Sequence, residues 1–391
     1  MGCRLLKVEL LIEHIKEAGI EVFSGVPDST LSEFCGYLGF QKNGLVHYTL
    51  PDEGAAVGVA AGTYLSTGKP ACVYMQNSGL GNMVNPVTSI AHSDVYNIPM
   101  LFIVGFRGEP GTKDEPQHKF MGKITRKMLG CLEIPHEIID KNTTGEQIKE
   151  IFSKVSVLLN SKKQFALIVK KDTFEKSDGQ NYENENTLCR ENVISEIIKN
   201  IGENDLVVST TGKISREVYE QSDRALGHHK PCFLTVGGMG HASMIAFGIA
   251  QSSPEKRVIC IDGDGAVLMH MGGLAFIGQQ KCDNLIHICL NNSAHESVGG
   301  MPTAAPDADI AKIAGACGYS DVAVVKTEDE LNEFIKRIKN IDNLTFAEIK
   351  VANTSRDDLG RPKESAEDNA ISFMNYLRGM HRGVLHTPAG C

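Results

Sequence analysis

Residues 257–268, RVICIDGDGAVL, contain a turn at which an expected strand leads into an expected helix. An apolar run ends in Ile261-Asp262-Gly263-Asp264-Gly265, and a helix-like stretch follows. The next apolar run, NLIHICL at 284–290, ends directly before Asn291 and Asn292. Short apolar runs that end in glycine or polar residues are typical of buried parallel strands. We therefore expect both motifs at the carboxyl edge of a parallel sheet, where open α/β sheets bind their ligands.

The same alternation of short apolar runs and helical stretches extends through both halves of the chain. Strands are predicted at 21–24, 45–50, 71–76, 100–105, 136–139, 165–170, 206–210, 232–236, 258–261, 285–290, 322–325 and 345–350. This pattern predicts an α/β protein with two doubly wound parallel-sheet modules and no middle domain. We assign the first module to 1–171, a polar linker to 172–188, the second module to 189–355 and a C-terminal arm to 356–391.

Composition narrows the classes of partner. Apolar residues make up 42% of the 391 residues and charged residues 22%, which is typical of a globular protein. The net charge of −9 argues against a nucleic-acid partner, because that binding depends on clustered Lys and Arg. No apolar run approaches the roughly 20 residues of a membrane span. We therefore expect no membrane partner. The 11 cysteines form no CxxC pair, so we expect a reducing, cytoplasmic location.

Asp264 and Asn292 together predict a magnesium–diphosphate site. Mg²⁺ prefers oxygen ligands, and it takes few of them from the protein when phosphate and water supply the rest. Asp264 offers a carboxylate, Asn292 an amide oxygen and Ala294 a backbone carbonyl. Gly263 and Gly265 would let the backbone approach a diphosphate. A lone Gly-Asp-Gly is more often only a turn, but the asparagine pair after the next strand favours binding.

Gly263-Asp264-Gly265 followed by Asn291-Asn292 closely resembles the signature of thiamine-diphosphate-dependent enzymes. The resemblance implies thiamine diphosphate and Mg²⁺ as cofactors. It also implies a pyrimidine-binding first module and a diphosphate-binding second module. In this family a carboxylate in the first module faces the pyrimidine ring. Glu53, which opens the small-residue stretch 53–62 (EGAAVGVAAG), resembles that residue.

The segment 236–242, VGGMGHA, resembles the part of the family's diphosphate-binding module that folds the cofactor. By this resemblance the carbonyl of Gly237 would accept a hydrogen bond from the pyrimidine amino group. Met239 would separate the two rings of the cofactor, although a methionine is more often core filler. Thr211 and Gly212, after the first predicted strand of the second module, are expected to contact the diphosphate.

Five further strings narrow the resemblance: GVPDS at 25–29, QNSGLGN at 76–82, RGEPG at 107–111, DEPQH at 114–118 and NSAHESVGG at 292–300. In combination they resemble the thiamine-dependent 2-oxo-acid decarboxylases that act on phosphonopyruvate and, close to them, on sulfopyruvate. The resemblance covers about residues 5–350. It implies decarboxylation of phosphonopyruvate to phosphonoacetaldehyde and CO₂, through a cofactor ylide and an enamine. It also implies a homodimer or homotetramer with active sites at subunit interfaces.

The substrate implied by this resemblance is a small, anionic 2-oxo acid, and basic and titratable residues follow several predicted strands. Asp28 and Ser29 resemble the position that handles the substrate carboxylate in related decarboxylases. We expect Asp28 and His118 to manage protons, with His118 in a long polar loop after 100–105 that could act as a lid. The phosphonate would be held by Arg107, Lys113 and His295.

Other functions stay open at this stage. A non-catalytic module that binds thiamine or a nucleotide would keep Asp264 and Asn292, but it would need neither Glu53 nor Met239. A nicotinamide-dependent oxidoreductase would need a G-x-G-x-x-G turn, and Gly79-Leu80-Gly81 is followed by Val84 where the third glycine should stand. Within the decarboxylases, sulfopyruvate or another anionic 2-oxo acid is the alternative substrate.

Overall fold

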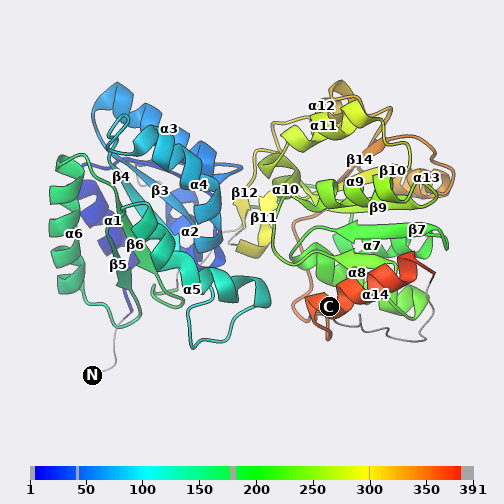
Figure 1. Cartoon of the computed structure of the whole chain (residues 1–391), viewed down its shortest axis with the longest axis horizontal. Helices are drawn as coiled ribbons and strands as arrows, with labels where there is room; N and C mark the ends of the chain where they lie inside the picture. Colours follow the sequence, from blue (N-terminus) through cyan, green and yellow to red (C-terminus); the bar gives the residue numbers. More distant parts are fainter. Residues whose placement is uncertain (1–4, 41–43, 177–181, 299, 380–391) are drawn as a thin grey trace, which may run out of the picture. The chain divides into compact units, whose positions relative to one another are not determined.

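The structure is a computed structural model that describes residues 5–40, 44–176, 182–298 and 300–379. The chain divides into two compact units, each with its own parallel sheet (Figure 1). The first unit comprises Met1–Tyr182 and Ala294–Ala304, and the second comprises Glu183–Ser293 and Ala305–Cys391. The segment Ala294–Ala304 therefore groups with the first unit, although it follows the asparagine pair in the sequence.

The first unit is built on a six-stranded sheet with the order β2-β1-β3-β4-β6-β5, in which all pairs are parallel. Its strands are β1 (Val22–Gly25), β2 (Val46–Thr49), β3 (Ala71–Gln76), β4 (Met100–Gly105), β5 (His136–Ile139) and β6 (Phe165–Val169). Consecutive side chains of a strand point to opposite faces. On β3, Tyr74 packs into one core while Val73 and Met75 pack into the other.

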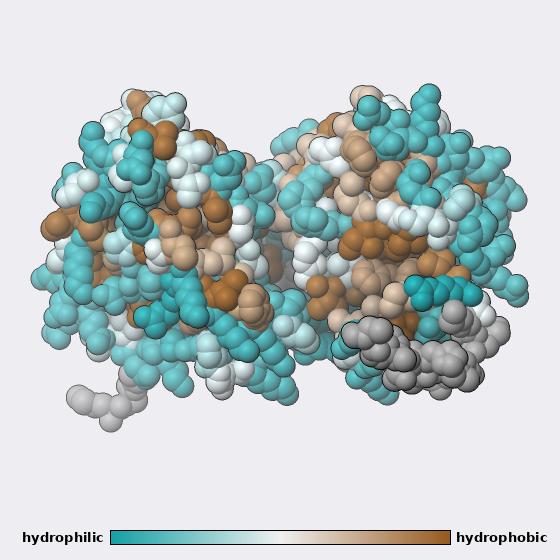
Figure 2. All heavy atoms as spheres, viewed as in Figure 1, coloured by the Kyte–Doolittle hydropathy of each residue, from teal (hydrophilic) through white to brown (hydrophobic). Residues whose placement is uncertain are grey.

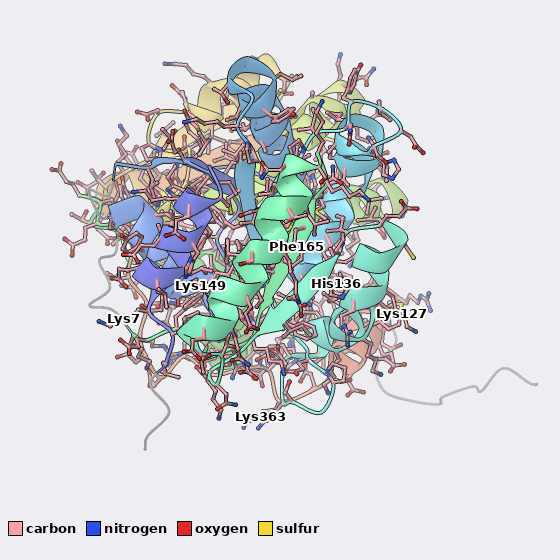
Figure 3. All side chains as sticks on the ribbon, turned by 90° about the vertical axis from the view of Figure 1, so that its left-hand side faces the viewer. Lys7, Lys127, His136, Lys149, Phe165 and Lys363 are labelled. Atoms are coloured by element: carbon pink, nitrogen blue, oxygen red, sulfur yellow. The ribbon has the colours of Figure 1, made fainter. Side chains whose placement is uncertain are left out.

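Helices cover both faces of this sheet. One core is closed by α1 (Val8–Glu17), α2 (Ser32–Phe40) and α6 (Gly145–Asn160). The other is closed by α3 (Glu53–Thr67), α4 (Leu80–Pro86) and α5 (Pro116–Cys131). Figure 3 views this unit from the side and shows Lys149 of α6 at the surface, whereas Phe165 at the start of β6 is buried.

The second unit repeats this architecture. Its sheet has the order β13-β14-β10-β9-β7-β8, again with parallel pairs only. The strands are β7 (Asp205–Ser209), β8 (Cys232–Leu234), β9 (Arg257–Gly263), β10 (Leu285–Asn291), β13 (Asp321–Val325) and β14 (Thr345–Lys350). Counted along the chain within each unit, the two sheets have the same strand order. The two halves therefore share one topology.

The second sheet is also covered on both faces. One core contains α7 (Arg190–Lys199), α8 (Lys213–Leu226) and α13 (Glu328–Ile338). The other contains α9 (Ala242–Ser252), α10 (Asp264–Met269), α11 (Gly272–Gln280), α12 (Ile310–Ala316) and α14 (Ala366–Leu377). The buried amide of Asn369 on α14 accepts from the N–H of Leu234 and donates to the carbonyl of Cys232, both at 3.0 Å. Helix α14 therefore completes the hydrogen bonding of the edge strand β8.

The predicted fold class is confirmed, and every strand expected from the sequence is present within a residue or two of its bounds. Differences lie between the strands. Ala294–His295 (β11) and Met301–Pro302 (β12) form a short antiparallel pair. Pro116 begins α5, so His118 lies in the first turn of a helix and the loop is shorter than expected. Proline suits this first helical position because its fixed φ matches the helix. The N–H that proline lacks would have no hydrogen-bond partner within the helix at this position.

The surface agrees with the composition. Figure 2 shows one face of the molecule as largely hydrophilic, with small hydrophobic areas on both units. Within the described ranges, none of the helices combines the length and apolarity that crossing a membrane requires.

Candidate active site

The two proposed metal ligands of the second unit follow neighbouring strands. Asp264 is the first residue of α10, directly after β9, and Asn292 directly follows β10. Both side chains are buried, with 3% and 5% exposed. Burial and then the nearby charge of Asp264 raise the pKa of the Cys289 thiol, which places this carboxylate beside β10. A buried carboxylate and a buried amide are thus brought to one edge of the sheet.

The turn that carries Asn292 is held by hydrogen bonds from its neighbours. The amide oxygen of Asn291 accepts from Ser293 N–H at 2.9 Å, which supports the left-handed conformation of Ser293 at φ 60°. The amide nitrogen of Asn291 donates to Glu348 on β14 at 2.6 Å. Lys350 also donates to Glu348, at 2.6 Å, and balances its buried charge. Asn291 thus fixes the turn, and Asn292 presents its side chain from it.

Two more turns of the second unit meet at the same sheet edge. Thr211, after β7, accepts from the N–H of Gly237, after β8, at 2.9 Å. Gly212 and Gly237 have positive φ values of 98° and 73°, a conformation that glycine adopts without strain. A Cβ at Gly240 would lie 2.5 Å from the ring of His270, at the end of α10. The turn that carries Met239 therefore packs against the helix that begins at Asp264.

Glu53 is the first residue of α3 in the first unit, and its side chain is buried. Burial raises the pKa of Glu53, against a hydrogen bond that Asn82 donates to its carboxylate at 2.7 Å. A Cβ at Gly79 would lie 2.2 Å from the carboxylate, so this turn needs glycine. Burial thus shifts this carboxyl group towards its protonated form, which is the form that could donate a hydrogen bond to a ring nitrogen.

Asp28 lies after β1 and is fully buried. Burial raises its pKa, while a 2.6 Å hydrogen bond from Gln76 and the charge of Arg107 oppose the rise. Thr30 N–H also donates to Asp28, at 3.0 Å. A Cβ at Gly105 would lie 2.0 Å from the carboxylate. The carboxyl group is thus enclosed by residues at the ends of three adjacent strands, β1, β3 and β4.

Arg107 is presented next to Asp28 by a dense set of contacts. Its Nε and Nη2 donate to Asp114 at 2.9 and 2.6 Å, and its Nη1 donates to Ser29 at 3.0 Å. These bonds to Asp114 raise the pKa of Arg107. Burial alone would raise the pKa of Asp114, but its bonds with Arg107, Gly108 and Glu115 hold it well below its usual range. The side chain of Asn77 hydrogen-bonds the backbone of Arg107 at both ends.

His118 approaches this group through close backbone packing. A Cβ at Gly108 would lie 1.9 Å from the carbonyl of His118, and one at Gly122 would lie 1.7 Å from the carbonyl of Gly108. Burial, followed by the charge of Arg107, lowers the pKa of His118. The charge of Arg107 thus acts on both Asp28 and His118.

The two other predicted phosphonate ligands differ in environment. Lys113 is exposed in the loop before α5. His295 lies on β11, and burial lowers its pKa to about 4. His295 is therefore neutral near pH 7, so it can contribute a hydrogen bond but not a positive charge.

The residues of the second unit suit the cofactor that the sequence implies. Mg²⁺ binds carboxylate and amide oxygens, and Asp264 and Asn292 offer both from buried positions. The glycines of the neighbouring turns leave the backbone open to a diphosphate. In the first unit, Glu53 is a buried carboxyl group whose pKa is raised by burial, which would suit a partner of a pyrimidine nitrogen.

Sequence reasoning missed several residues that organise these groups. Gln76 stands at the end of β3, where the rule of strand ends could have found it. Asp114 entered the sequence analysis only as part of the string 114–118, whereas the structure shows that it orients Arg107. Asn82 had no recognisable signal, because its contact with Glu53 depends on how α4 packs against α3.

Comparisons with known proteins agree with this description. The family described as "Thiamine pyrophosphate enzyme, N-terminal TPP binding domain" matches residues 7–128. The family described as "Thiamine pyrophosphate enzyme, C-terminal TPP binding domain" matches residues 211–349. Together these regions make up more than half of the chain. The chain belongs to the thiamine pyrophosphate enzymes, which confirms the resemblance seen in the sequence.

Three curated relatives are similar along almost their whole length. Phosphonopyruvate decarboxylase of Streptomyces viridochromogenes is 33% identical, over 94% of this chain and 94% of its own. Phosphonopyruvate decarboxylase of Streptomyces hygroscopicus is 30% identical, over 92% of this chain and 90% of its own. Sulfopyruvate decarboxylase of Methanosarcina acetivorans is 27% identical, over 92% and 95%.

Replacement of Asp264 tests the metal site. Asp264→Ala should abolish the rise in melting temperature that thiamine diphosphate and Mg²⁺ give to the wild type. At 100 times the dissociation constant a ligand stabilises by about 2.7 kcal/mol, so the lost shift is measurable by thermal unfolding. Asp283 is an exposed carboxylate before β10, and Asp283→Ala should keep the rise in melting temperature. An unchanged shift in Asp264→Ala would contradict the assignment.

Replacement of Glu53 tests the pyrimidine partner. Glu53→Gln keeps the shape of the side chain but cannot transfer a proton. We expect cofactor binding to persist and exchange of the C2 proton of the bound cofactor to slow by about 100-fold or more, as followed by NMR after acid quench. The exposed Glu21→Gln is the control. Wild-type exchange in Glu53→Gln would refute this role.

Proposed function

We propose that this enzyme decarboxylates 3-phosphonopyruvate to phosphonoacetaldehyde and CO₂, a step of phosphonate biosynthesis, with thiamine diphosphate and Mg²⁺ as cofactors. The observation that carries the substrate assignment is full-length similarity to two phosphonopyruvate decarboxylases at 30 and 33% identity. The guanidinium of Arg107, held by Asp114 and Ser29, supports this substrate assignment, because a strongly anionic substrate needs a positioned cation.

The residues of the second unit would hold the cofactor. Asp264, Asn292 and the carbonyl of Ala294 are the proposed ligands of Mg²⁺. The turns at Thr211 and Gly212 and at Gly263 and Gly265 are the proposed contacts of the diphosphate. Gly237 and Met239 would keep the cofactor folded, and Glu53 would hydrogen-bond its pyrimidine. When bound, thiamine diphosphate supplies the electron sink that accepts the electron pair left by CO₂.

The residues of the first unit would bind and orient the substrate. Asp114 takes two donors of Arg107, and this fixes the plane of the guanidinium before substrate arrives. A fixed guanidinium suits phosphonate oxygens, which accept paired hydrogen bonds. Ser29, bonded to the same guanidinium, is the proposed contact of the substrate carboxylate. Lys113 would add charge from the loop, and His295 would add a neutral hydrogen bond.

Asp28 and His118 are the proposed proton carriers. The raised pKa of Asp28 favours a protonated carboxyl group, which can donate to the carbon that loses CO₂. The lowered pKa of His118 favours a neutral ring, which can accept and return a proton near neutral pH. Enclosure of Asp28 by Gln76 and Gly105 also keeps water from the carboxyl group.

The same proposal includes an assembly. Glu53 and Asp264 belong to different units, and we propose that they meet across the subunit interface of a homodimer or homotetramer. We further propose a cytoplasmic location. The described cysteines are free thiols, and six of them are buried, which suits a reducing compartment.

Sulfopyruvate is the second candidate substrate, on the strength of the similarity to the Methanosarcina acetivorans enzyme. We expect a coupled aldehyde assay to give the highest kcat/KM with phosphonopyruvate, a lower value with sulfopyruvate and the lowest with pyruvate, which lacks the second anion. Turnover should need both thiamine diphosphate and Mg²⁺. A preference for sulfopyruvate would overturn the substrate assignment, and a preference for pyruvate would overturn the role of Arg107 as well.

His118→Ala should lower kcat by about 100-fold, because it removes a group that carries a proton in the reaction. Cofactor affinity should stay close to that of the wild type, since His118 is not among the residues proposed to hold the cofactor or Mg²⁺. His136 lies at the amino end of β5, and His136→Ala should change neither kcat nor cofactor affinity. An increase in KM with unchanged kcat would make His118 a binding residue and leave proton transfer to Asp28.

A further inference from the structure

The segment before α7, residues 183–188, connects the two halves of the sequence and also hydrogen-bonds to strand ends of the second unit. Residues 183–188 form neither helix nor strand, and buried or half-buried residues alternate with exposed ones. Asn184, Asn186 and Leu188 point inward, whereas Glu183, Glu185 and Thr187 are exposed. The carbonyl of Leu188 accepts from the N–H of Ala352, just beyond β14, at 2.8 Å. The segment therefore lies along the carboxyl ends of strands in the second unit.

The side chain of Asn184 links this segment to the turn that carries Asn292. Its side-chain nitrogen donates to the carbonyl of Asn292 at 2.7 Å and to the carbonyl of Val351 at 3.2 Å. Its side-chain oxygen accepts from the N–H of Asn186 at 3.1 Å, which holds the amide in one orientation. A single side chain thus joins the ends of β10 and β14.

The proposed metal ligands of this turn are the side chain of Asn292 and the backbone carbonyl of Ala294. The carbonyl of Asn292 belongs to the Asn292–Ser293 peptide, which lies between these two ligands along the chain. On the strand side this turn is fixed by Asn291, which accepts from Ser293 N–H. Asn353 accepts from the side-chain nitrogen of Asn292 at 3.2 Å and so orients its amide. Asn184 donates to the carbonyl of this peptide while Asn291 accepts from its N–H, so the peptide is held at both ends. Loss of Asn184 would remove a hydrogen bond from a buried acceptor and loosen the peptide.

We propose that Asn184 is a positioning residue for metal binding. It holds the Asn292 peptide so that the amide oxygen of Asn292 and the carbonyl of Ala294 face one cation. This inference rests on the proposed Mg²⁺–thiamine diphosphate site. It extends that site to a residue in a segment that the sequence marks only as a polar connection.

The test is calorimetric titration of Mg²⁺ into the full-length protein at saturating thiamine diphosphate. Loss of a residue that supports a metal ligand typically weakens metal affinity 10- to 100-fold. We therefore expect Asn184→Ala to raise the dissociation constant of Mg²⁺ by about tenfold or more. Asn184→Asp, which has the same size but no donor, should weaken binding at least as much. At saturating Mg²⁺ both variants should recover most of the wild-type kcat.

Asn186→Ala is the matched control, because Asn186 lies in the same segment and donates to Val351 at 3.1 Å. It should bind Mg²⁺ within about twofold of the wild type, and the melting temperatures of the cofactor-free variants show whether each one folds. Wild-type affinity in Asn184→Ala would overturn the inference, as would equal weakening in both alanine variants. Absence of Mg²⁺ binding by the wild type would instead refute the proposed site.

Discussion

Parallel pairing between neighbouring strands brings the carboxyl ends of a whole sheet to one edge. In the first unit this places Asp28, Gln76 and Arg107 together, although they are far apart in the sequence. In the second unit it places Asp264 beside Asn292. Each candidate site is thus a consequence of strand pairing, and the local turns only decide which atoms face the ligand.

The buried charges at these edges are balanced in two different ways. Arg107 and Asp114 form a bidentate pair, and Lys350 compensates Glu348. Glu53 and Asp28 instead receive a neutral amide hydrogen bond each, and burial raises the pKa of both. The paired charges fix geometry, whereas Glu53 and Asp28, which form no ion pair of this kind with the described residues and whose pKa values are raised by burial, are suited to carry protons. This difference in electrostatics agrees with the roles proposed for them.

Much of the fold was readable from the sequence, because parallel strands with both faces covered are continuous apolar runs. Asp264 and Asn292 could be predicted for the same reason, since each directly follows such a run. Asp114 and Asn184 could not. Both lie in polar stretches without periodicity, and their function depends on hydrogen bonds to residues brought near by the fold. The position of His118 was misjudged because the proline before it starts a helix.

We propose that one active site takes Glu53 from one subunit and Asp264 from another. The direct measurement mixes the inactive variants Glu53→Gln and Asp264→Ala, exchanges their subunits and records decarboxylation. In a mixed dimer, one of the two sites then contains both wild-type residues. We predict recovery of about a quarter of the wild-type activity, because random exchange makes about half of the dimers mixed. If both residues act from the same chain, every site of a mixed dimer keeps one defect. Activity that stays at the level of the separate variants would therefore contradict a site shared between subunits.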